Sequence, residues 1–293
     1  MLKKKIEKPH SKQTRRQFIQ ATALATPLAV SSACADLKQK PEPQTLRSFG
    51  NSPLKLGLAS YTLRKFTLDE TLAMMQRLAI KQLKLKSFHL PLDSKPEEIR
   101  AAVAKITKAR IKLYGGGVIY MENEAHLNQA FEYAKQSGVS TIVGVPNSEL
   151  LHLVDKKARQ YDINVAIHNH GPGDELYPTP ASVYDKIEPL DKRIGLCIDI
   201  GHTQRAGIDP CDSIRTFADR LLDVDFKDVT SPTEAGKAVE IGRGVVNIPA
   251  VLSALLAIGY SGIVAFEYEK DADDPLAGLA ESVGYVRGVL AAI

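Results

Sequence analysis

Eight short apolar runs, separated by longer segments with helical periodicity, constrain the fold of this 293-residue chain more than any other feature. Alternation of this kind is typical of βα units around a parallel sheet. The runs are LKLGLASY, QLKLKSFHL, IKLYGGGVI, STIVGVPN, INVAIHNHG, IGLCIDIGH, LLDVDFKDV and GIVAFEYE. Eight units in about 240 residues match the size of one (β/α)8 barrel. We therefore expect a single-domain α/β fold, a (β/α)8 TIM barrel, over residues 54–293.

A doubly wound α/β fold is the main alternative to the barrel. That fold needs a glycine-rich phosphate-binding turn after its first strand. The sequence at the first run, GLASYTLRK, contains no G-x-G-x-x-G motif. This absence favours the barrel.

The first 35 residues predict an export signal. A basic stretch that ends with Arg15 and Arg16 is followed by Phe18, Ile19 and a small-residue apolar stretch over 21–33. This order is that of a signal peptide, and the apolar stretch is shorter than the ~20 residues that span a bilayer. The paired arginines resemble a twin-arginine signal, and an ordinary secretion signal is the alternative. We expect an exported, periplasmic protein.

Two processing sites are compatible with this signal. Cleavage can follow the A-x-A-like sequence Ala33-Cys34-Ala35, or Cys34 can end a lipobox and become lipidated. We favour the lipobox, which would anchor the protein to the membrane as a lipoprotein. Residues 36–53 contain three prolines and no apolar period, so they read as a linker.

The signal also explains the positive net charge. Residues 1–35 hold seven basic side chains and one acidic side chain, a sum of +6, whereas the whole chain carries +4. The remainder is therefore at −2, which gives no support for nucleic-acid binding. Beyond Cys34 only Cys197 and Cys211 remain, too few for a disulfide framework.

Polar side chains gather where the predicted strands end, which is where active sites of (β/α)8 barrels lie. Imidazole and carboxylate groups in apolar strands are costly to bury unless they are paired or bind a metal. Together they can hold a divalent ion such as Mn, Mg, Co or Zn. The residues in these positions are His89, His168, Asn169, His170, Asp199, His202, Asp225, Lys227, Asp228, Glu267 and Glu269.

From about Leu54 onward the chain resembles the sugar phosphate isomerase/epimerase group of the xylose isomerase-like TIM-barrel superfamily. The resemblance is carried, in order, by GLASYTLRKF, LKSFHLP, VAIHNHGPGDELYPTP, IGLCIDIGHTQRAGIDP, FKDVT, IGRGVVNIP and FEYE. It implies a metal held by four strand-end residues, usually a glutamate, an aspartate, a histidine and a glutamate. Asp199 and Glu267 match two of these positions.

The other two positions depart from the family pattern. The fifth-strand place falls on His168, with His170 as the alternative, and the seventh-strand place falls on Asp225. The implied ligand set is therefore one histidine and three carboxylates. The resemblance also implies that His202, just after the sixth strand, contacts the substrate. From their positions in the sequence we expect further substrate-binding residues to be His89, His170, Lys86, Lys227 and Arg243, the last in a long loop over 230–247.

The resemblance implies an isomerase or epimerase that works through an enediolate stabilised by the metal. Glu267 is the expected base, and His168, His170 or His202 would return the proton. We expect a non-phosphorylated sugar or ketosugar as the substrate. A lyase acting on 3-keto-glycosides and a non-catalytic sugar-binding barrel are the alternatives, whereas a metallonuclease would need more metal ligands and a basic surface. The sequence does not indicate the oligomeric state.

Overall fold

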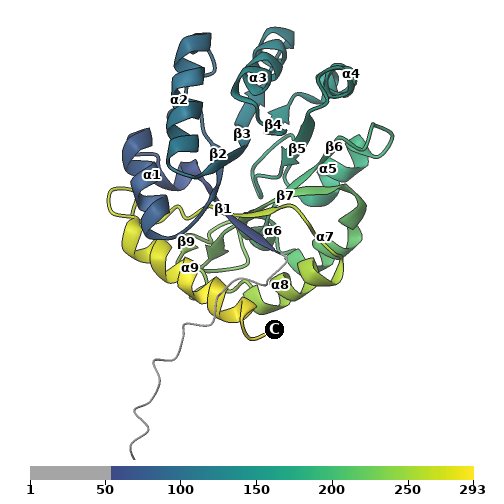
Figure 1. Cartoon of the computed structure of the whole chain (residues 1–293). Coiled ribbons are helices and arrows are strands. Elements are labelled where there is room, and N and C mark those ends of the chain that lie inside the picture. Colours follow the sequence, from purple (N-terminus) through teal and green to yellow (C-terminus); the bar gives the residue numbers. More distant parts are fainter. Residues whose placement is uncertain (1–53) are drawn as a thin grey trace, which may run out of the picture. The chain divides into compact units, whose positions relative to one another are not determined.

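The computed structural model describes residues 54–293, and the predicted export signal and linker lie outside these residues. Eight parallel strands form a closed barrel in the order β1-β10-β7-β6-β5-β4-β3-β2 (Figure 1). This confirms the predicted single (β/α)8 barrel. The strands are β1 (Lys55–Ala59), β2 (Gln82–Leu85), β3 (Lys112–Met121), β4 (Thr141–Pro146), β5 (Asn164–His168), β6 (Ile194–Asp199), β7 (Leu221–Phe226) and β10 (Ile263–Phe266).

Helices connect successive strands and surround the barrel (Figure 1). Within the described part of the chain, none of them is long and apolar enough to cross a membrane. The helices are α1 (Leu68–Arg77), α2 (Pro96–Lys108), α3 (Glu124–Ser137), α4 (Leu151–Tyr161), α5 (Pro180–Ile187), α6 (Ile200–Arg205), α7 (Pro210–Thr216), α8 (Ile248–Ala257) and α9 (Leu276–Leu290), with 3-10 turns η1 (Ser60–Leu63), η2 (Ser148–Leu150) and η3 (Ala218–Arg220).

The strands are apolar along most of their length because both of their faces are covered. Every residue of β4 and of β6 is buried, as is expected of parallel strands with side chains packed inside the barrel and helices outside it. The register between neighbouring strands determines which polar residues lie together at the carboxyl end of the barrel. His168 lies opposite Cys197, and Asp199 lies opposite Asp225, so the polar ends of three neighbouring strands come together.

A short hairpin follows β7 and is anchored by one carboxylate. The hairpin pairs β8 (Asp228–Val229) with β9 (Ala238–Val239). The fully buried Asp228 side chain accepts hydrogen bonds of 2.8–3.1 Å from the backbone N–H groups of Val229, Gly242, Gly244 and Val246. A Cβ at Gly244 would lie 2.1 Å from the carboxylate, so only glycine allows this close approach.

Asp228→Asn is expected to destabilise the fold by about 3 kcal/mol, because the amide group would present N–H donors to N–H donors. Urea unfolding followed by circular dichroism measures this change. Asp273→Asn is the matched control, since the Asp273 side chain is 89 % exposed. Equal loss of stability in the two variants would contradict the anchoring role of Asp228.

Candidate active site at the barrel mouth

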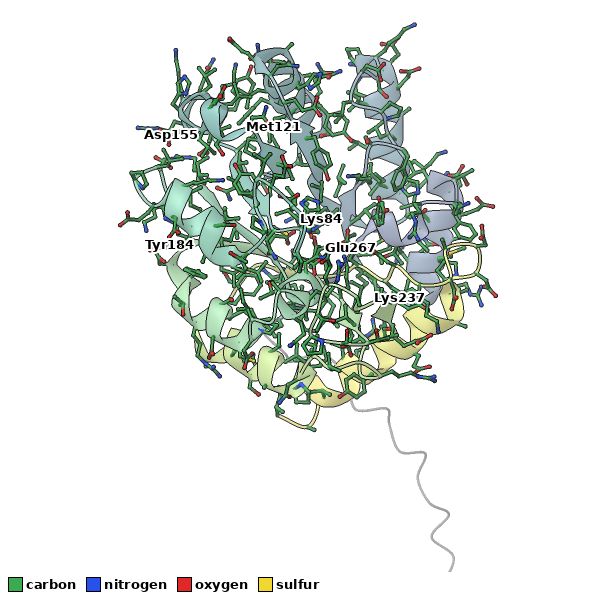
Figure 2. All side chains as sticks on the ribbon, turned by 180° about the vertical axis from the view of Figure 1, so that it is seen from behind. Lys84, Met121, Asp155, Tyr184, Lys237 and Glu267 are labelled. Atoms are coloured by element: carbon green, nitrogen blue, oxygen red, sulfur yellow. The ribbon has the colours of Figure 1, made fainter. Side chains whose placement is uncertain are left out.

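Three potential metal ligands converge from three strand ends. His168 is the last residue of β5, Asp199 is the last residue of β6, and Glu267 directly follows β10. One ligand atom from each lies within 4.8 Å of the others, and all three residues are buried. In the view of Figure 2, Glu267 is labelled near the centre of the barrel. The sequence prediction had placed these three residues in one site, and the structure brings them together.

Several polar atoms of this group have no hydrogen-bond partner in the described part of the chain. They are both ring nitrogens of His168 and Oδ2 of Asp199. Buried polar atoms are nearly always hydrogen-bonded, so a cluster of nitrogen and oxygen atoms without partners needs a physical reason. One imidazole and two carboxylates form a donor set that suits a divalent cation. These residues therefore fit the metal that the sequence predicts.

The Lys227 ammonium lies between the carboxylates of this site. Its Nζ is 2.6 Å from Glu269, 2.9 Å from Asp199 and 3.1 Å from Glu267. The contact with Asp199 lies outside hydrogen-bond geometry, which is why that oxygen remains without a hydrogen-bond partner. Burial alone would lower the pKa of Lys227, but the surrounding carboxylates raise it well above its usual value. A metal ion at these oxygens would compete with a charged lysine.

Asp225 belongs to a deeper layer of charged residues. Lys84 Nζ, which is fully buried, lies 2.5 Å from Asp225 and 2.8 Å from Asp223. Tyr114 donates a hydrogen bond of 3.2 Å to Asp223. Asp225 also lies 3.3 Å from Nε2 of His168. The ion pair with Lys84 occupies one oxygen of Asp225, so its role as the fourth metal ligand stays a prediction.

Burial and neighbouring charges shift the proton affinities of the site. Burial raises the pKa of Glu267 to about 7, although Lys227 acts in the opposite sense. Burial alone would lower the pKa of His168, but Asp199 and Asp225 raise it to about 9. Burial alone would raise the pKa of Asp199, but the neighbouring histidines and Lys227 hold it well below its usual range. Glu267 is thus the carboxylate of this group best able to exchange a proton near neutral pH.

His170 and His202 flank the three converging residues. Their ring centroids are 6.0 Å apart, and burial lowers their pKa values to about 4 and about 2. Nε2 of His170 lies 3.1 Å from the hydroxyl of Tyr120, and Nε2 of His202 lies 3.3 Å from Lys227 Nζ. Both imidazoles are therefore neutral at physiological pH.

Two of the predicted sugar-binding residues already have other partners in the structure. Lys86 donates a 2.5 Å hydrogen bond to the carbonyl of Val118 at the rim. Arg243 forms a two-point ion pair with Glu281 of α9, and its side chain is 63 % exposed. Contact of either residue with a sugar stays a prediction.

His89 joins the first two βα units. Its Nδ1 lies 3.0 Å from the hydroxyl of Ser60, and its Nε2 lies 3.0 Å from the carbonyl of Phe66 and 3.1 Å from the hydroxyl of Thr71. Burial lowers the pKa of His89 below its usual value. The geometry gives this residue a structural role, and its contact with a sugar stays a prediction.

This burial predicts a pH dependence of stability. The unfolded chain protonates His89 near pH 6.5, whereas the folded protein does so only at lower pH, so the stability it contributes is complete above pH 6.5 and is lost as the pH falls. His89→Gln is expected to reduce the loss of unfolding free energy between pH 7 and pH 5, measured by urea titration. His126→Gln is the control, because that side chain is 45 % exposed. An unchanged pH profile in His89→Gln would contradict the prediction.

Three residues near the site were not predicted from the sequence. They are Lys84 and Asp223 of the deeper layer and Arg205 at the end of α6. Lys84 and Asp223 each carry a charge within an apolar strand, and this feature of the sequence could have identified them. Arg205 offered no such signal, because an arginine in a helix is ordinary.

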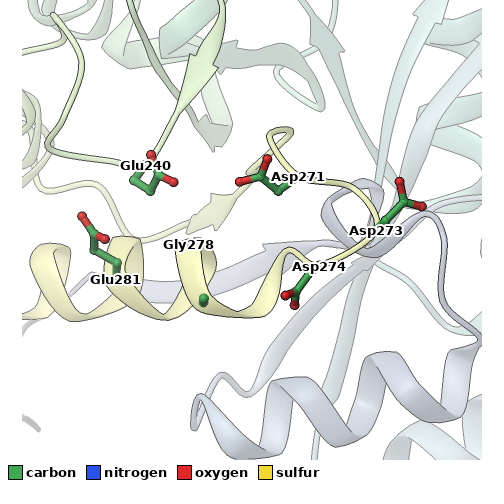
Figure 3. A pocket seen from close by; sticks show the side chains of 7 residues that line it. Glu240, Asp271, Asp273, Asp274, Gly278 and Glu281 are labelled. Carbon is green, nitrogen blue, oxygen red and sulfur yellow. The ribbon is translucent and has the colours of Figure 1, made fainter.

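The surface also has an acidic hollow of about 540 Å³, which Figure 3 shows beside α9. Gly278 and Glu281 of α9 line it together with Glu240 and the loop that precedes the helix. Lys270 Nζ pairs with Glu240 at 2.7 Å. The converging residues His168, Asp199 and Glu267 are not among those that line this hollow.

Solved structures with the same fold have low sequence identity to this chain. The IolI protein with a bound zinc atom aligns with a TM-score of 0.69 and 17 % identity, over 82 % of this chain and 99 % of its own. The 3-keto-D-glucoside 4-epimerase YcjR from E. coli aligns with a TM-score of 0.66 and 15 % identity, over 80 % of this chain and 99 % of its own. The probable 3-DHS dehydratase AsbF from Bacillus anthracis aligns with a TM-score of 0.65 and 14 % identity, over 80 % of this chain and 98 % of its own. At such identities the likeness shows a shared barrel.

Sequence comparison assigns the family. No match was found among curated proteins. Residues 120–289, more than half of the chain, match the xylose isomerase-like TIM barrel family. This match covers β4 to β10 and most of α9, and therefore includes His168, Asp199 and Glu267. The chain belongs to the xylose isomerase-like TIM barrel family.

Proposed function

We propose that the protein is a divalent-metal-dependent isomerase or epimerase that acts on a non-phosphorylated sugar or ketosugar. The observation that supports this most is the convergence of His168, Asp199 and Glu267, with buried nitrogen and oxygen atoms that lack hydrogen-bond partners. A zinc-bearing protein and a keto-sugar epimerase share the fold. A bound divalent cation would supply Lewis-acid stabilisation of negative charge on a sugar oxygen.

Glu267 is the residue best placed to move a proton. Its carboxylate is buried, faces the site, and has a pKa raised to about 7 by burial. A base whose pKa lies near the working pH can remove a proton from the carbon next to a ketone and then return it. A single carboxylate can carry the proton between adjacent carbons on one face of the sugar, which suits isomerisation.

Epimerisation needs a second group on the opposite face of the sugar. His170 and His202 are the side chains available for this role, and both are neutral. Lys227 and Lys86 would hold sugar oxygens at the rim. Lys227 would then exchange part of its contact with Glu267 and Asp199 for contact with the substrate.

A lyase that eliminates the leaving group from a 3-keto-glycoside is the second candidate. It is favoured by the histidine at the fifth-strand position, because an imidazole can protonate a leaving group where a carboxylate would exchange a carbon-bound proton. A dehydratase is among the proteins that share the fold. In this alternative Glu267 would still remove the proton, and His168, His170 or His202 would protonate the departing oxygen.

The test measures metal content and proton exchange in the same preparation. The purified protein is reconstituted with Mn, Mg, Co or Zn, analysed for bound metal, and incubated in D₂O with D-fructose or a 3-keto-glucoside. About one equivalent of metal with deuterium incorporation supports the isomerase, and release of the aglycone supports the lyase. Sugar binding without exchange or elimination would indicate a binding protein, and no bound metal would refute the metal-dependent mechanism.

A further inference from the structure

A basic hollow of about 370 Å³ adjoins the candidate active site. Four cationic side chains line it, and Glu269 is the only carboxylate among its lining residues in the described part of the chain. The cations are Arg205, Lys227, Lys237 and Lys270. Because Lys227 also contacts Asp199 and Glu267, the hollow opens directly beside the proposed catalytic group.

Two of the four cations are already neutralised. Lys227 is surrounded by carboxylates, and Lys270 pairs with Glu240 at 2.7 Å. Arg205 and Lys237 have no carboxylate partner in the described part of the chain. The ion pair between Lys227 and Glu269 also neutralises the carboxylate in the hollow. Among the residues that line the hollow, Arg205 and Lys237 are therefore the two cations that no carboxylate pairs with.

Contacts on two sides hold Arg205 in place. Its NH1 lies 3.1 Å from Nδ1 of His202, and its NH2 donates a 2.8 Å hydrogen bond to the carbonyl of Glu234. The buried Nε has no hydrogen-bond partner in the structure described for residues 54–293. The hairpin packs against the same side chain, since a Cβ at Gly236 would lie 3.1 Å from Cγ of Arg205. A guanidinium fixed in this way is preorganised to bind an anion.

Lys237 of the hairpin lines the same hollow as Arg205. It precedes β9, and its side chain is exposed. It lines the hollow together with Lys227 and Glu269. A planar acidic group between Arg205 and Lys237 would accept charge-assisted hydrogen bonds from both, and these are about twice as strong as neutral ones.

We infer that this hollow binds an anionic group of the substrate, a carboxylate or a phosphate, between Arg205 and Lys237. The inference rests on the proposed function and refines it, because it makes the substrate an acidic sugar. The acidic group would lie at one end of the sugar, with the carbon that loses its proton near Glu267. The sequence has no glycine-rich phosphate turn, and this favours a carboxylate.

The experiment compares the binding of three probes by calorimetry with the metal-reconstituted full chain. The probes are D-galacturonate, D-glucose 6-phosphate and neutral D-galactose. Arg205→Gln and Lys237→Met are each expected to weaken binding of the preferred acidic sugar by about 10- to 100-fold, the range for hydrogen bonds to charged groups. Binding of D-galactose and the metal content should stay unchanged. Lys81→Met is the control, because that exposed lysine precedes β2 at the other end of the barrel.

Each outcome decides the inference. Tighter binding of D-galacturonate identifies a carboxylate site, and tighter binding of D-glucose 6-phosphate identifies a phosphate site. Equal affinity for all three probes, or acidic-sugar binding that neither variant weakens, overturns the inference. If the wild-type protein binds metal and exchanges protons of a neutral ketosugar only, the proposed function stands and the anionic subsite fails. If the protein takes up no metal but binds acidic sugars, and both variants weaken that binding, the anionic subsite stands and the metal-dependent function fails.

Discussion

Replacing Glu267 by glutamine is expected to lower the rate of substrate proton exchange by about 10²- to 10⁴-fold, the usual contribution of a general base. The amide keeps the size of the side chain and cannot accept the proton. It also removes one of three converging carboxylate or imidazole ligands, so weaker metal binding should accompany the loss of rate. Deuterium incorporation and elemental analysis of the same sample measure both effects.

Glu269→Gln provides the matched control for this variant. Glu269 lies two residues further along, pairs with the same Lys227, and does not belong to the group that converges with His168 and Asp199. Its side chain is 32 % exposed. We expect the metal content of Glu269→Gln to equal that of the wild type. A proton-exchange rate in Glu267→Gln close to the wild-type rate would exclude Glu267 as the base.

Much of the barrel could be predicted because parallel strands buried on both faces are continuous apolar runs. Each of the eight runs coincides with one strand of the observed barrel. Differences arise where a run ends. β3 continues to Met121, and this extension brings Tyr120 to within hydrogen-bond distance of His170. Neither the extension nor the contact follows from local sequence, because both depend on how β3 pairs with β4.

The sequence predicts which types of residue form the candidate site, but it does not predict how deeply each side chain lies in the barrel. Lys84 lies in β2 and Lys86 follows the end of that strand two residues later, so the sequence predicts the same side for both, yet only Lys84 is fully buried and pairs with Asp225. The register between β6 and β7 places Asp199 opposite Asp225, and the depth of each side chain follows from the stagger of the closed sheet. That stagger is a property of all eight strands together.

The orientation of the long loop after β7 could not be predicted for the same reason. Its position depends on four backbone hydrogen bonds to Asp228, a residue that the sequence shows only as the neighbour of Lys227. Arg243 then pairs with Glu281 on α9, a helix that begins 33 residues later in the chain. Contacts this distant in sequence leave no local pattern.

Lys84→Met is expected to destabilise the protein by about 3–5 kcal/mol, the cost of breaking a buried ion pair by removing one partner. The variant leaves Asp223 and Asp225 buried without their counter-ion, while methionine fills most of the space. Burial already raises the pKa of Asp223, although Lys84 opposes this effect, so in the variant Asp223 should bind a proton more readily. Unfolding in urea at pH 7 measures the loss of stability.

The matched control is Lys105→Met, which removes a lysine from an ion pair of the same length. Lys105 lies 2.8 Å from Asp69, but both side chains are largely exposed, so the expected loss is at most about 1 kcal/mol. Replacing Asp223 by asparagine in the Lys84→Met background should restore part of the stability, because one uncompensated buried charge is then removed. Equal losses in Lys84→Met and Lys105→Met would show that the deep layer is not held by its charges. A Lys84→Met protein of reduced stability that still binds one equivalent of metal would instead separate this deep layer from the ligands His168, Asp199 and Glu267.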